Sequence, residues 1–268
     1  MIIIGEKING SIPAVAKAIA ERDESEIRMR ARIQTEAGAD YLDCAAGTDT
    51  SLEYDAMRWL ISVIQDEVDT PICIDSPDAD LLARLLSEDI FAKPGMINSV
   101  NEEGSKCETV FPLIAGTDWN VIGLCSGRNG IPAEADGRLE IAKQIIAKAD
   151  RFGVARANLH IDPGVLALAT MPTSLKDFVY CIEKIHAYAP DVKVTGAVSN
   201  VSFNMPCRKY VNMACMVNAV NAGLDSVIMD PTSENMQGIM YAASALSGAD
   251  TGGRMYNRAY RKGRFGKK

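Results

Sequence analysis

The sequence predicts an α/β protein built as a single (β/α)8 barrel, a TIM barrel, and two observations support this fold. Eight short, nearly continuous apolar runs alternate with longer amphipathic segments along the 268 residues. Eight such units average about 33 residues each, and no linker rich in Pro, Gly or Ser divides the chain. An open, doubly wound sheet is the alternative fold. Neither a GxGxxG loop nor a GxxxxGK(S/T) loop follows the first apolar run, which disfavours it.

The eight apolar runs are the candidate strands, because parallel strands that are buried on both faces have few polar positions. They are Ile2–Gly5, Tyr41–Cys44, Ile72–Ile74, Met96–Ile97, Val121–Cys125, Leu159–Ile161, Val192–Val198 and Ser226–Met229.

Helices are predicted between these runs from apolar residues at helical spacing and from glycines or prolines that end each pattern. They are Ser11–Ala20, Glu24–Ala37, Leu52–Val68, Asp136–Phe152, Ser174–Tyr188, Arg208–Ala222 and Glu234–Leu246. We therefore expect residues 1–253 to form the barrel and residues 254–268 to form a basic C-terminal tail.

Polar side chains follow every predicted strand. They are Glu6 and Asn9, Asp43, Asp75 and Ser76, Asn98 and Ser99, Ser126, Asp162, Ser199 and Asn200, and Asp230. Asp, Asn and Ser also begin turns and cap helices, which explains any one of them. In a barrel, however, all of them converge on the carboxyl-terminal face, where barrel enzymes place their chemistry.

The chemistry of this ring favours a flat heterocycle with fused donors and acceptors. A carboxylate can accept two parallel N–H bonds from an amino-pyrimidine edge, and an amide can donate or accept. A pterin has such an edge. A carboxylate site for a divalent cation would use the same residues and stays open at this point.

Charge and composition exclude several classes of function. The net charge of −7 and the pI near 5.0 argue against nucleic-acid binding. Met1 is followed by only three apolar residues, and no apolar run is long enough to cross a bilayer, so we expect a cytoplasmic protein without membrane contact. Seven Lys and Arg and no acid lie between Arg254 and Lys268, either as a solvated end or as a docking element.

Cysteine and histidine spacing gives no metal or nucleophile motif. The seven cysteines contain no CxxC pair and are expected to be reduced and buried. His160 and His186 are the only histidines, and His160 is expected to be a satisfied core residue. No metal held by the protein is expected.

Six sequence pieces in order identify a family resemblance: GEKING, CIDSPD, MINSVN, IGLC, IDP and SNVSFN. Together they resemble the pterin-binding methyltransferases that exchange methyl groups between methyltetrahydrofolate and a corrinoid protein. The similarity is greatest to the corrinoid/iron–sulfur protein methyltransferase of acetogens and to the tetrahydrofolate methyltransferases of O-demethylase and glycine betaine systems. It covers Met1 to about Asp250.

The resemblance implies a homodimeric barrel whose carboxyl-terminal end binds tetrahydrofolate or 5-methyltetrahydrofolate, with a cobalamin carried by a corrinoid protein partner. The implied pterin-binding and catalytic positions follow from the matching motifs. They are Glu6, Asp75, Asn98, Asp162, Gly196, Ser199, Asn200 and Arg208.

Among these positions, Asn200 is the implied catalytic residue, because the family's Asn lies near the methyl-bearing nitrogen. An amide does not titrate near neutrality, so it cannot act as an ordinary general acid, but it can donate a hydrogen bond or position a water that supplies the proton. Phe203 stands where the acetogen enzyme has Gln, which replaces a polar group by an apolar ring. Methyl transfer that forms methyltetrahydrofolate in a demethylase system is the expected function. A dihydropteroate synthase-like enzyme and a non-catalytic folate-binding subunit are the alternatives.

Overall fold

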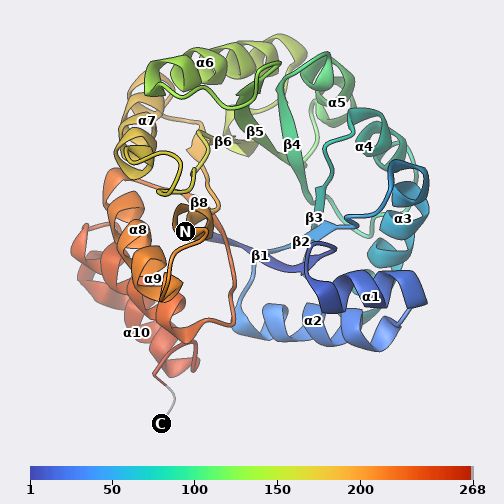
Figure 1. The fold of residues 1–268 in the computed structure, drawn as a ribbon, viewed down its shortest axis with the longest axis horizontal. Helices are drawn as coiled ribbons and strands as arrows, with labels where there is room; N and C mark the ends of the chain where they lie inside the picture. The colour runs from blue at the N-terminus through green and yellow to red at the C-terminus, as the bar shows by residue number, and fades with distance from the viewer. Residues whose placement is uncertain (267–268) are drawn as a thin grey trace.

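Parallel strands wind around a central axis, and helices surround them, in the computed structural model, which describes residues 1–266 (Figure 1). The described strands are β1 (Ile2–Asn9), β2 (Tyr41–Ala45), β3 (Ile72–Asp75), β4 (Met96–Glu102), β5 (Asn120–Gly127), β6 (Leu159–Asp162), β7 (Lys193–Val194) and β8 (Ser226–Met229). The described α-helices are α1 (Pro13–Glu21), α2 (Glu24–Ala37), α3 (Thr50–Glu67), α4 (Ala79–Leu86), α5 (Lys106–Ile114), α6 (Ala135–Phe152), α7 (Ser174–Tyr188), α8 (Arg208–Ala222), α9 (Glu234–Leu246) and α10 (Arg254–Arg261).

The strand order confirms the predicted barrel and excludes the doubly wound sheet. Neighbouring strands pair in parallel in the order β7-β6-β5-β4-β3-β2-β1-β8. The ring closes between β7 and β8 through single contacts, because the amide of Asp225 donates to the carbonyl of Val194 and that of Ile228 to the carbonyl of Gly196. The carboxyl ends of all the strands therefore meet at one face.

Local sequence explains where the helices begin and end. The side chain of Asp23 accepts a hydrogen bond from the amide of Ser25 and caps α2, and that helix ends at Gly38 with a φ of 92°. Ser233 caps α9 in the same way, through the amide of Met236. Such caps satisfy amides that have no partner inside the helix.

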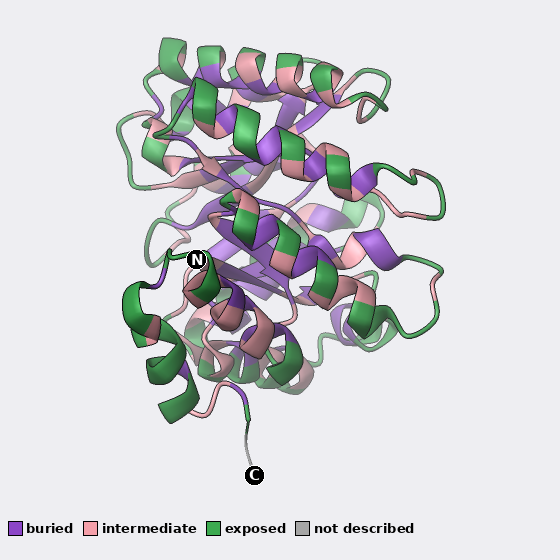
Figure 2. Ribbon diagram, turned by 90° about the vertical axis from the view of Figure 1, so that its left-hand side faces the viewer, coloured by how far each residue is buried: buried purple, intermediate pink, exposed green. Residues whose placement is uncertain are grey.

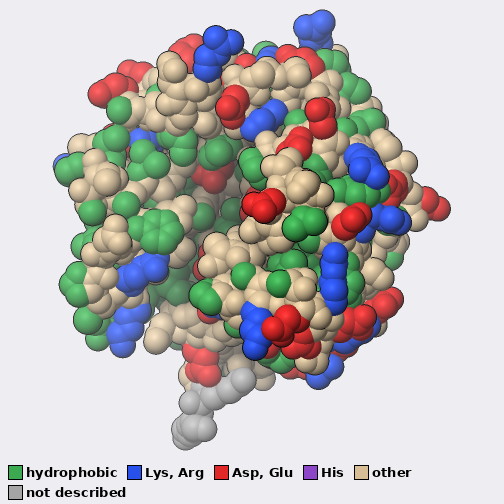
Figure 3. All heavy atoms as spheres, turned by 45° about the vertical axis from the view of Figure 1, so that its right-hand side comes forward, with side chains coloured by type: hydrophobic (Ala, Val, Ile, Leu, Met, Phe, Trp, Pro, Cys, Tyr) green, Lys and Arg blue, Asp and Glu red, His purple; other side chains and the backbone are tan. Residues whose placement is uncertain are grey.

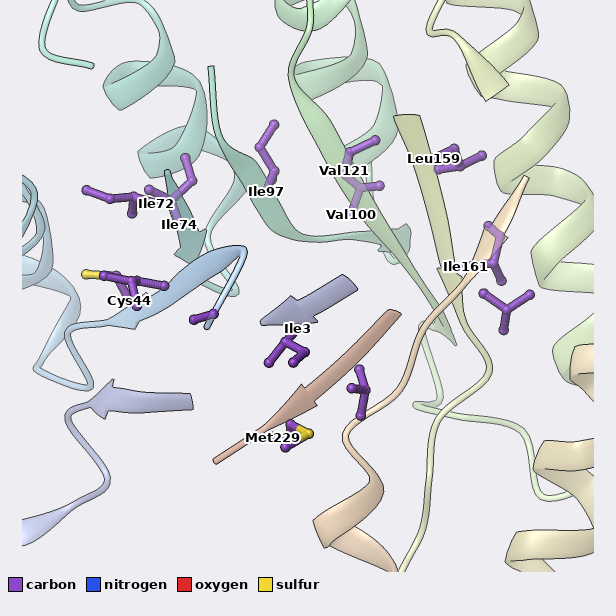
Figure 4. Close-up of a cluster of buried hydrophobic side chains, with 14 of the residues drawn as sticks. Ile3, Cys44, Ile72, Ile74, Ile97, Val100, Val121, Leu159, Ile161 and Met229 are labelled. Atoms are coloured by element: carbon purple, nitrogen blue, oxygen red, sulfur yellow. The ribbon is translucent and has the colours of Figure 1, made fainter. Parts of the chain in front are cut away.

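Two layers of apolar side chains stabilise the barrel. The larger cluster lies between strands and helices, and Figure 4 shows Ile3, Ile74, Ile97, Val121 and Ile161 as part of it. The smaller cluster contains Ile4, Cys73, Met96, Ile122 and Ile228, on neighbouring strands. Figure 2 shows the result, with buried residues inside and exposed ones on the outer faces of the helices. Each fully buried Ile or Leu contributes about 1.5–3 kcal/mol.

The predicted seventh strand was wrong at its carboxyl end. Only Lys193–Val194 form β7, and residues Val198–Ser202 form a 3-10 helix, η2. The apolar residues Val198 and Val201 are buried there as loop residues, so burial rather than strand pairing explains this part of the apolar run. Helices α4, α5 and α10 were not predicted, because α4 and α10 have only eight residues each and α5 contains Pro112.

The basic segment after Gly253 is partly a packed helix. Residues Arg254–Arg261 form α10, which packs against α9. Phe265 is 8% exposed and contacts the rings of Tyr241, Tyr256 and Tyr260. The last two residues of the predicted tail, 267 and 268, lie outside the described residues.

His160 is a satisfied core residue, as expected. It is fully buried at the amino-terminal end of the barrel, where its Nδ1 lies 2.7 Å from Ser226 Oγ and its Nε2 lies 3.2 Å from Asn120 Oδ1. Since an amide oxygen only accepts, Nε2 carries the proton and Nδ1 accepts from the serine. Burial lowers the pKa of His160 to about 3, so the ring stays neutral.

The cysteines follow the prediction with one exception. All seven are free, and six are buried, but Cys207 is exposed because it lies in the turn before α8, with a φ of 49°. Acidic and basic side chains are interspersed over the face drawn in Figure 3, without a large field of one sign. Within residues 1–266, no helix combines the length and apolarity needed to cross a membrane.

Candidate functional site

A cavity of about 660 Å³ lies at the carboxyl-terminal mouth of the barrel. Its wall brings together most of the strand-end residues of the predicted ring. These are Glu6, Asn9, Asp43, Asp75, Asn98, Ser199, Asn200 and Asp230, and Arg208 joins them from α8. The volume is within the range of small-molecule sites.

Asp75 and Asn98 lie side by side because they are register partners on β3 and β4. Asp43 lies two residues before Ala45, the partner of Asp75 on β2, so it points the same way one layer deeper. Asn98 Nδ2 donates to Asp43 Oδ1 at 3.2 Å. This bond orients the amide and leaves Asn98 Oδ1 as a free acceptor.

Asp75 presents an unpaired carboxyl to the cavity, since no described residue donates a hydrogen bond to it. Burial raises the pKa of Asp75, and the charges of Asp43 and Glu53 raise it further. Burial also raises the pKa of Asp43, against the lowering effect of the Asn98 hydrogen bond. This carboxyl pair therefore keeps a proton at pH values where exposed carboxyls have lost theirs.

Glu6 adds a third carboxyl to those of Asp43 and Asp75, and these three side chains are called the acidic floor of the cavity. Its pKa is raised first by burial and then by the charge of Asp230, while Lys7 and Arg208 lower it. Asp230 in turn forms an ion pair with Lys7 at 3.3 Å. The floor thus offers hydrogen-bond acceptors, and positive charge lies around it.

Asn200 lies on η2 and is held by backbone bonds. Its amide donates to Ala197 O at 3.0 Å, and its carbonyl accepts from the amide of Phe203 at 3.2 Å. Its side-chain amide makes no hydrogen bond to any described residue and lines the cavity. The amide group is therefore free to bind a ligand.

Arg208 fixes the loop that carries Asn200 and Ser199. Its guanidinium donates to Ser199 O at 2.8 Å and to Ser202 Oγ at 2.9 Å. It also lies over the ring of Phe203, with 4.9 Å between Cζ and the ring centroid. Since Ser199 uses its carbonyl in this way, Arg208 shapes the wall as well as lining it.

Asp162 and Gly196 are not part of the cavity wall. Asp162 is 8% exposed, and its Oδ1 accepts from the amide of Gly164 at 2.7 Å. Burial raises the pKa of Asp162 to about 6, against the lowering effects of that amide and of Arg138. Gly196 packs against Phe178, because a Cβ at this position would lie 2.6 Å from Phe178 Cζ.

Arg138 holds the loop that contains Asp162 and Gly164. Its guanidinium is fully buried and donates to the carbonyls of Pro132, Ala133 and Gly164 at 2.8, 3.2 and 3.3 Å. It thus ties the segment after β5 to the loop after β6. A buried charge without such acceptors would be strongly unfavourable.

Sequence reasoning missed several cavity residues as site residues. Asp43 was placed at a strand end but not assigned to the site, while Lys7, Lys209 and Asn212 were not singled out. Lys7 lies inside the GEKING motif and Lys209 directly follows Arg208, so the position of each next to an assigned residue is the signal that could have found it. Within residues 1–266, no group of three or more His, Cys, Asp and Glu side chains could hold a metal ion.

Most of the chain matches one protein family. Residues 13–230 match the family model described as pterin binding enzyme. The chain belongs to the pterin-binding enzyme family. The cavity at its barrel mouth, with an amide and carboxyls on neighbouring strand ends, lies largely within this matched region.

Similar proteins and solved structures cover nearly the whole chain. The methylcorrinoid:tetrahydrofolate methyltransferase of Eubacterium limosum is 41% identical over 268 residues, which is 99% of this chain and 98% of that protein. The dihydropteroate synthase of Yersinia pestis, solved with a pterine-sulfa conjugate, has a TM-score of 0.64 at 15% identity and covers 93% of this chain and 94% of that one. A dihydropteroate synthase of Coxiella burnetii, solved with pteroic acid, has a TM-score of 0.62 at 14% identity, with 93% and 94% covered. These structures share the barrel fold.

Proposed function

We propose that this protein transfers a methyl group between a corrinoid protein and tetrahydrofolate, and that it acts mainly from methylcorrinoid to tetrahydrofolate. The observation that carries the proposal is that the free amide of Asn200 lines the same cavity as the Asp75–Asn98 pair. The 41% identity to the Eubacterium limosum methyltransferase over nearly the whole chain supports it.

The pterin ring is proposed to bind through its amino-pyrimidine edge. The ionised carboxylate of Asp75 accepts two N–H bonds from this edge, and Asn98 Oδ1 accepts a third, because Asp43 already holds the Asn98 amide nitrogen. Asp162 lies outside the cavity wall and its Oδ1 accepts from Gly164, so its other oxygen, Oδ2, is the proposed additional contact to this edge in the bound state. Glu6, Ser199 and Arg208 line the same cavity, and Gly196 lets Phe178 approach behind the loop.

Asn200 is the proposed catalytic residue. The lone pair of the pterin N5 attacks the methyl carbon, the carbon–cobalt bond breaks with both electrons left on cobalt, and N5 then loses its proton to solvent. Positive charge develops on N5–H as the new bond forms. A hydrogen bond from N5–H to Asn200 Oδ1 strengthens at that moment and lowers the barrier. No covalent enzyme intermediate is needed.

The partner's corrinoid supplies the methyl group, so the enzyme needs an open mouth and a fixed pterin orientation. An open mouth is supported by Phe203, a residue of the cavity wall whose side chain is 46% exposed. Orientation and electrostatics are then the contributions of this chain. We also propose that the protein is cytoplasmic and that it forms a homodimer, the second of which the family resemblance implies. Light scattering on the pure protein would test the homodimer.

Single-turnover transfer from methylcobalamin to saturating tetrahydrofolate tests the role of Asn200. Asn200→Ala should slow transfer about 10²–10³-fold with a smaller loss of pterin affinity. The matched control is Asn218→Ala, an exposed α8 residue outside the cavity wall whose side chain bonds only Ala214 O. Wild-type rates in Asn200→Ala at saturation would refute the catalytic role.

Two further measurements separate the alternative functions. Consumption of p-aminobenzoate with a pterin diphosphate would identify a dihydropteroate synthase-like enzyme. Tight pterin binding without turnover on a reduced or methylated corrinoid would identify a folate-binding subunit.

A further inference from the structure

The cavity is larger than a pterin ring requires. Its volume of about 660 Å³ extends from the acidic strand ends to Phe203, Arg208 and Lys209 at the rim. Tetrahydrofolate continues beyond its pterin as an aminobenzoyl ring and a glutamate with two carboxylates. The rim is therefore the part of the cavity where a ligand for this end of the proposed substrate is sought.

The three cations of the cavity wall differ in what they bind. Lys7 is paired with Asp230, and Arg208 donates to Ser199 O and Ser202 Oγ. Lys209 is exposed, and its ammonium forms neither a hydrogen bond nor an ion pair with any described residue. It lies 4.8 Å from the ring centroid of Tyr210. Of these three, Lys209 is the one whose charge is available to an anion.

Phe203 supplies an apolar surface next to this charge. The ring is 46% exposed and has the Arg208 guanidinium on one side. Asn204 and Cys207 adopt left-handed φ angles of 62° and 49°, so the chain turns sharply between Phe203 and α8. This turn places Lys209, in the first turn of α8, on the same rim as the ring.

We propose that Phe203 and Lys209 bind the aminobenzoyl-glutamate end of the folate, and that Lys209 gives the enzyme a preference for folates with several glutamates. The aminobenzoyl ring packs on the exposed face of Phe203, and the carboxylates pair with Lys209. Each added glutamate brings one more carboxylate to the rim, while the acidic floor repels carboxylates from the pterin end. The proposal rests on the proposed function, since it assumes a folate substrate.

Calorimetry with three ligands tests this tail site: 5-methyltetrahydrofolate monoglutamate, its triglutamate, and a 5-methyltetrahydropterin without the tail. Wild type should bind the triglutamate more tightly at low salt. Lys209→Ala should reduce the triglutamate-to-monoglutamate affinity ratio about two- to fivefold, as expected for an exposed ion pair, and Lys209→Glu should reduce it further. Phe203→Ala should weaken both folates alike and leave the tailless pterin unchanged.

The matched control is Lys184→Ala on α7. Its ammonium also lies over a tyrosine ring, 5.3 Å from the centroid of Tyr180, but outside this cavity. It should leave the affinity ratio unchanged.

An unchanged ratio in Lys209→Glu would overturn the tail site, as would equal weakening of the tailless pterin by Phe203→Ala. Methyl transfer from methylcobalamin by the wild type reports separately on the proposed function. An enzyme that transfers methyl groups without any tail dependence would overturn the tail site alone, and a wild type that binds no pterin ligand would overturn both.

Discussion

Asp162→Asn distinguishes a pterin ligand from a loop anchor. The substitution keeps an oxygen that can accept from the amide of Gly164, so the turn after β6 is preserved, and it removes only the ionisable group. If the ionised carboxylate binds the N–H edge of the pterin, the variant should bind more weakly at pH 7. The penalty should then shrink as the pH falls, because wild-type Asp162 becomes protonated.

The size of this change follows from the pKa of Asp162, which burial raises to about 6. The ionised fraction of Asp162 falls about tenfold between pH 7 and pH 5. The affinity advantage of wild type over Asp162→Asn should therefore shrink about tenfold, which corresponds to about 1.4 kcal/mol. Comparing the two proteins at each pH cancels the titration of Asp75, Asp43 and Glu6, which is common to both.

Calorimetric titration with tetrahydrofolate at pH 5, 6 and 7 measures this ratio. Asp118→Asn serves as the control, since Asp118 is exposed in the loop before β5, at the opposite end of the barrel. It should follow the wild-type profile. A ratio between wild type and Asp162→Asn that is constant from pH 5 to pH 7 would show that Asp162 acts in the loop alone, as its place outside the cavity wall also allows.

Three further outcomes are expected. Between pH 7 and pH 5, His160→Gln should lose about 2 kcal/mol less stability than wild type in urea denaturation. The reason is that His160 in the unfolded state takes up a proton below pH 6.5, whereas in the folded state its pKa is about 3 and it stays neutral. Arg138→Met should lower the free energy of unfolding by about 1–3 kcal/mol per carbonyl left without a donor and weaken pterin binding, and Arg138→Lys should rescue part of both. Replacing Arg258 and Lys262 by Gln should leave pterin affinity intact and make transfer to the corrinoid protein less sensitive to salt; identical salt profiles would indicate a solvated tail.

The third experiment changes charges and keeps α10, for a structural reason. Ending the chain before Arg254 would remove Phe265, which packs on three tyrosines, and Ala259, which is 4% exposed. A truncated protein would then lose packing together with charge. The amphipathic pattern of eight residues is too short to have predicted this packing from the sequence.

Periodicity predicted the barrel because its signal is repeated in every unit. The helices Glu24–Ala37, Ser174–Tyr188, Arg208–Ala222 and Glu234–Leu246 have the predicted bounds. The seventh strand differs because apolar residues are needed there for a buried 3-10 turn, and pattern alone does not separate this from a strand. Likewise, strand ends predicted that Asp75, Asn98 and Asn200 would converge, and these residues do line one cavity.

Contacts across the barrel could not be read from the sequence. Asp43 accepts a hydrogen bond from Asn98 although the two are 55 residues apart in sequence, because alternate strands contribute side chains to the same interior layer. The sequence showed that both residues end strands, but not that one fixes the amide orientation of the other. Arg138 was missed for the same reason, because its acceptors are backbone carbonyls and carry no sequence signal.

The Asp43–Asp75 pair gives the site a reason to be acidic beyond hydrogen bonding. With the pKa of both carboxyls raised, the free site keeps a proton near Asp75 and limits the repulsion among Asp43, Asp75 and Glu53. Binding of N–H donors favours the ionised form of Asp75, so the pterin should displace this proton. The Asp43–Asp75 pair therefore carries less negative charge before the substrate arrives and offers a full acceptor once the substrate is bound. Recognition of a neutral heterocycle is thus coupled to the release of a proton.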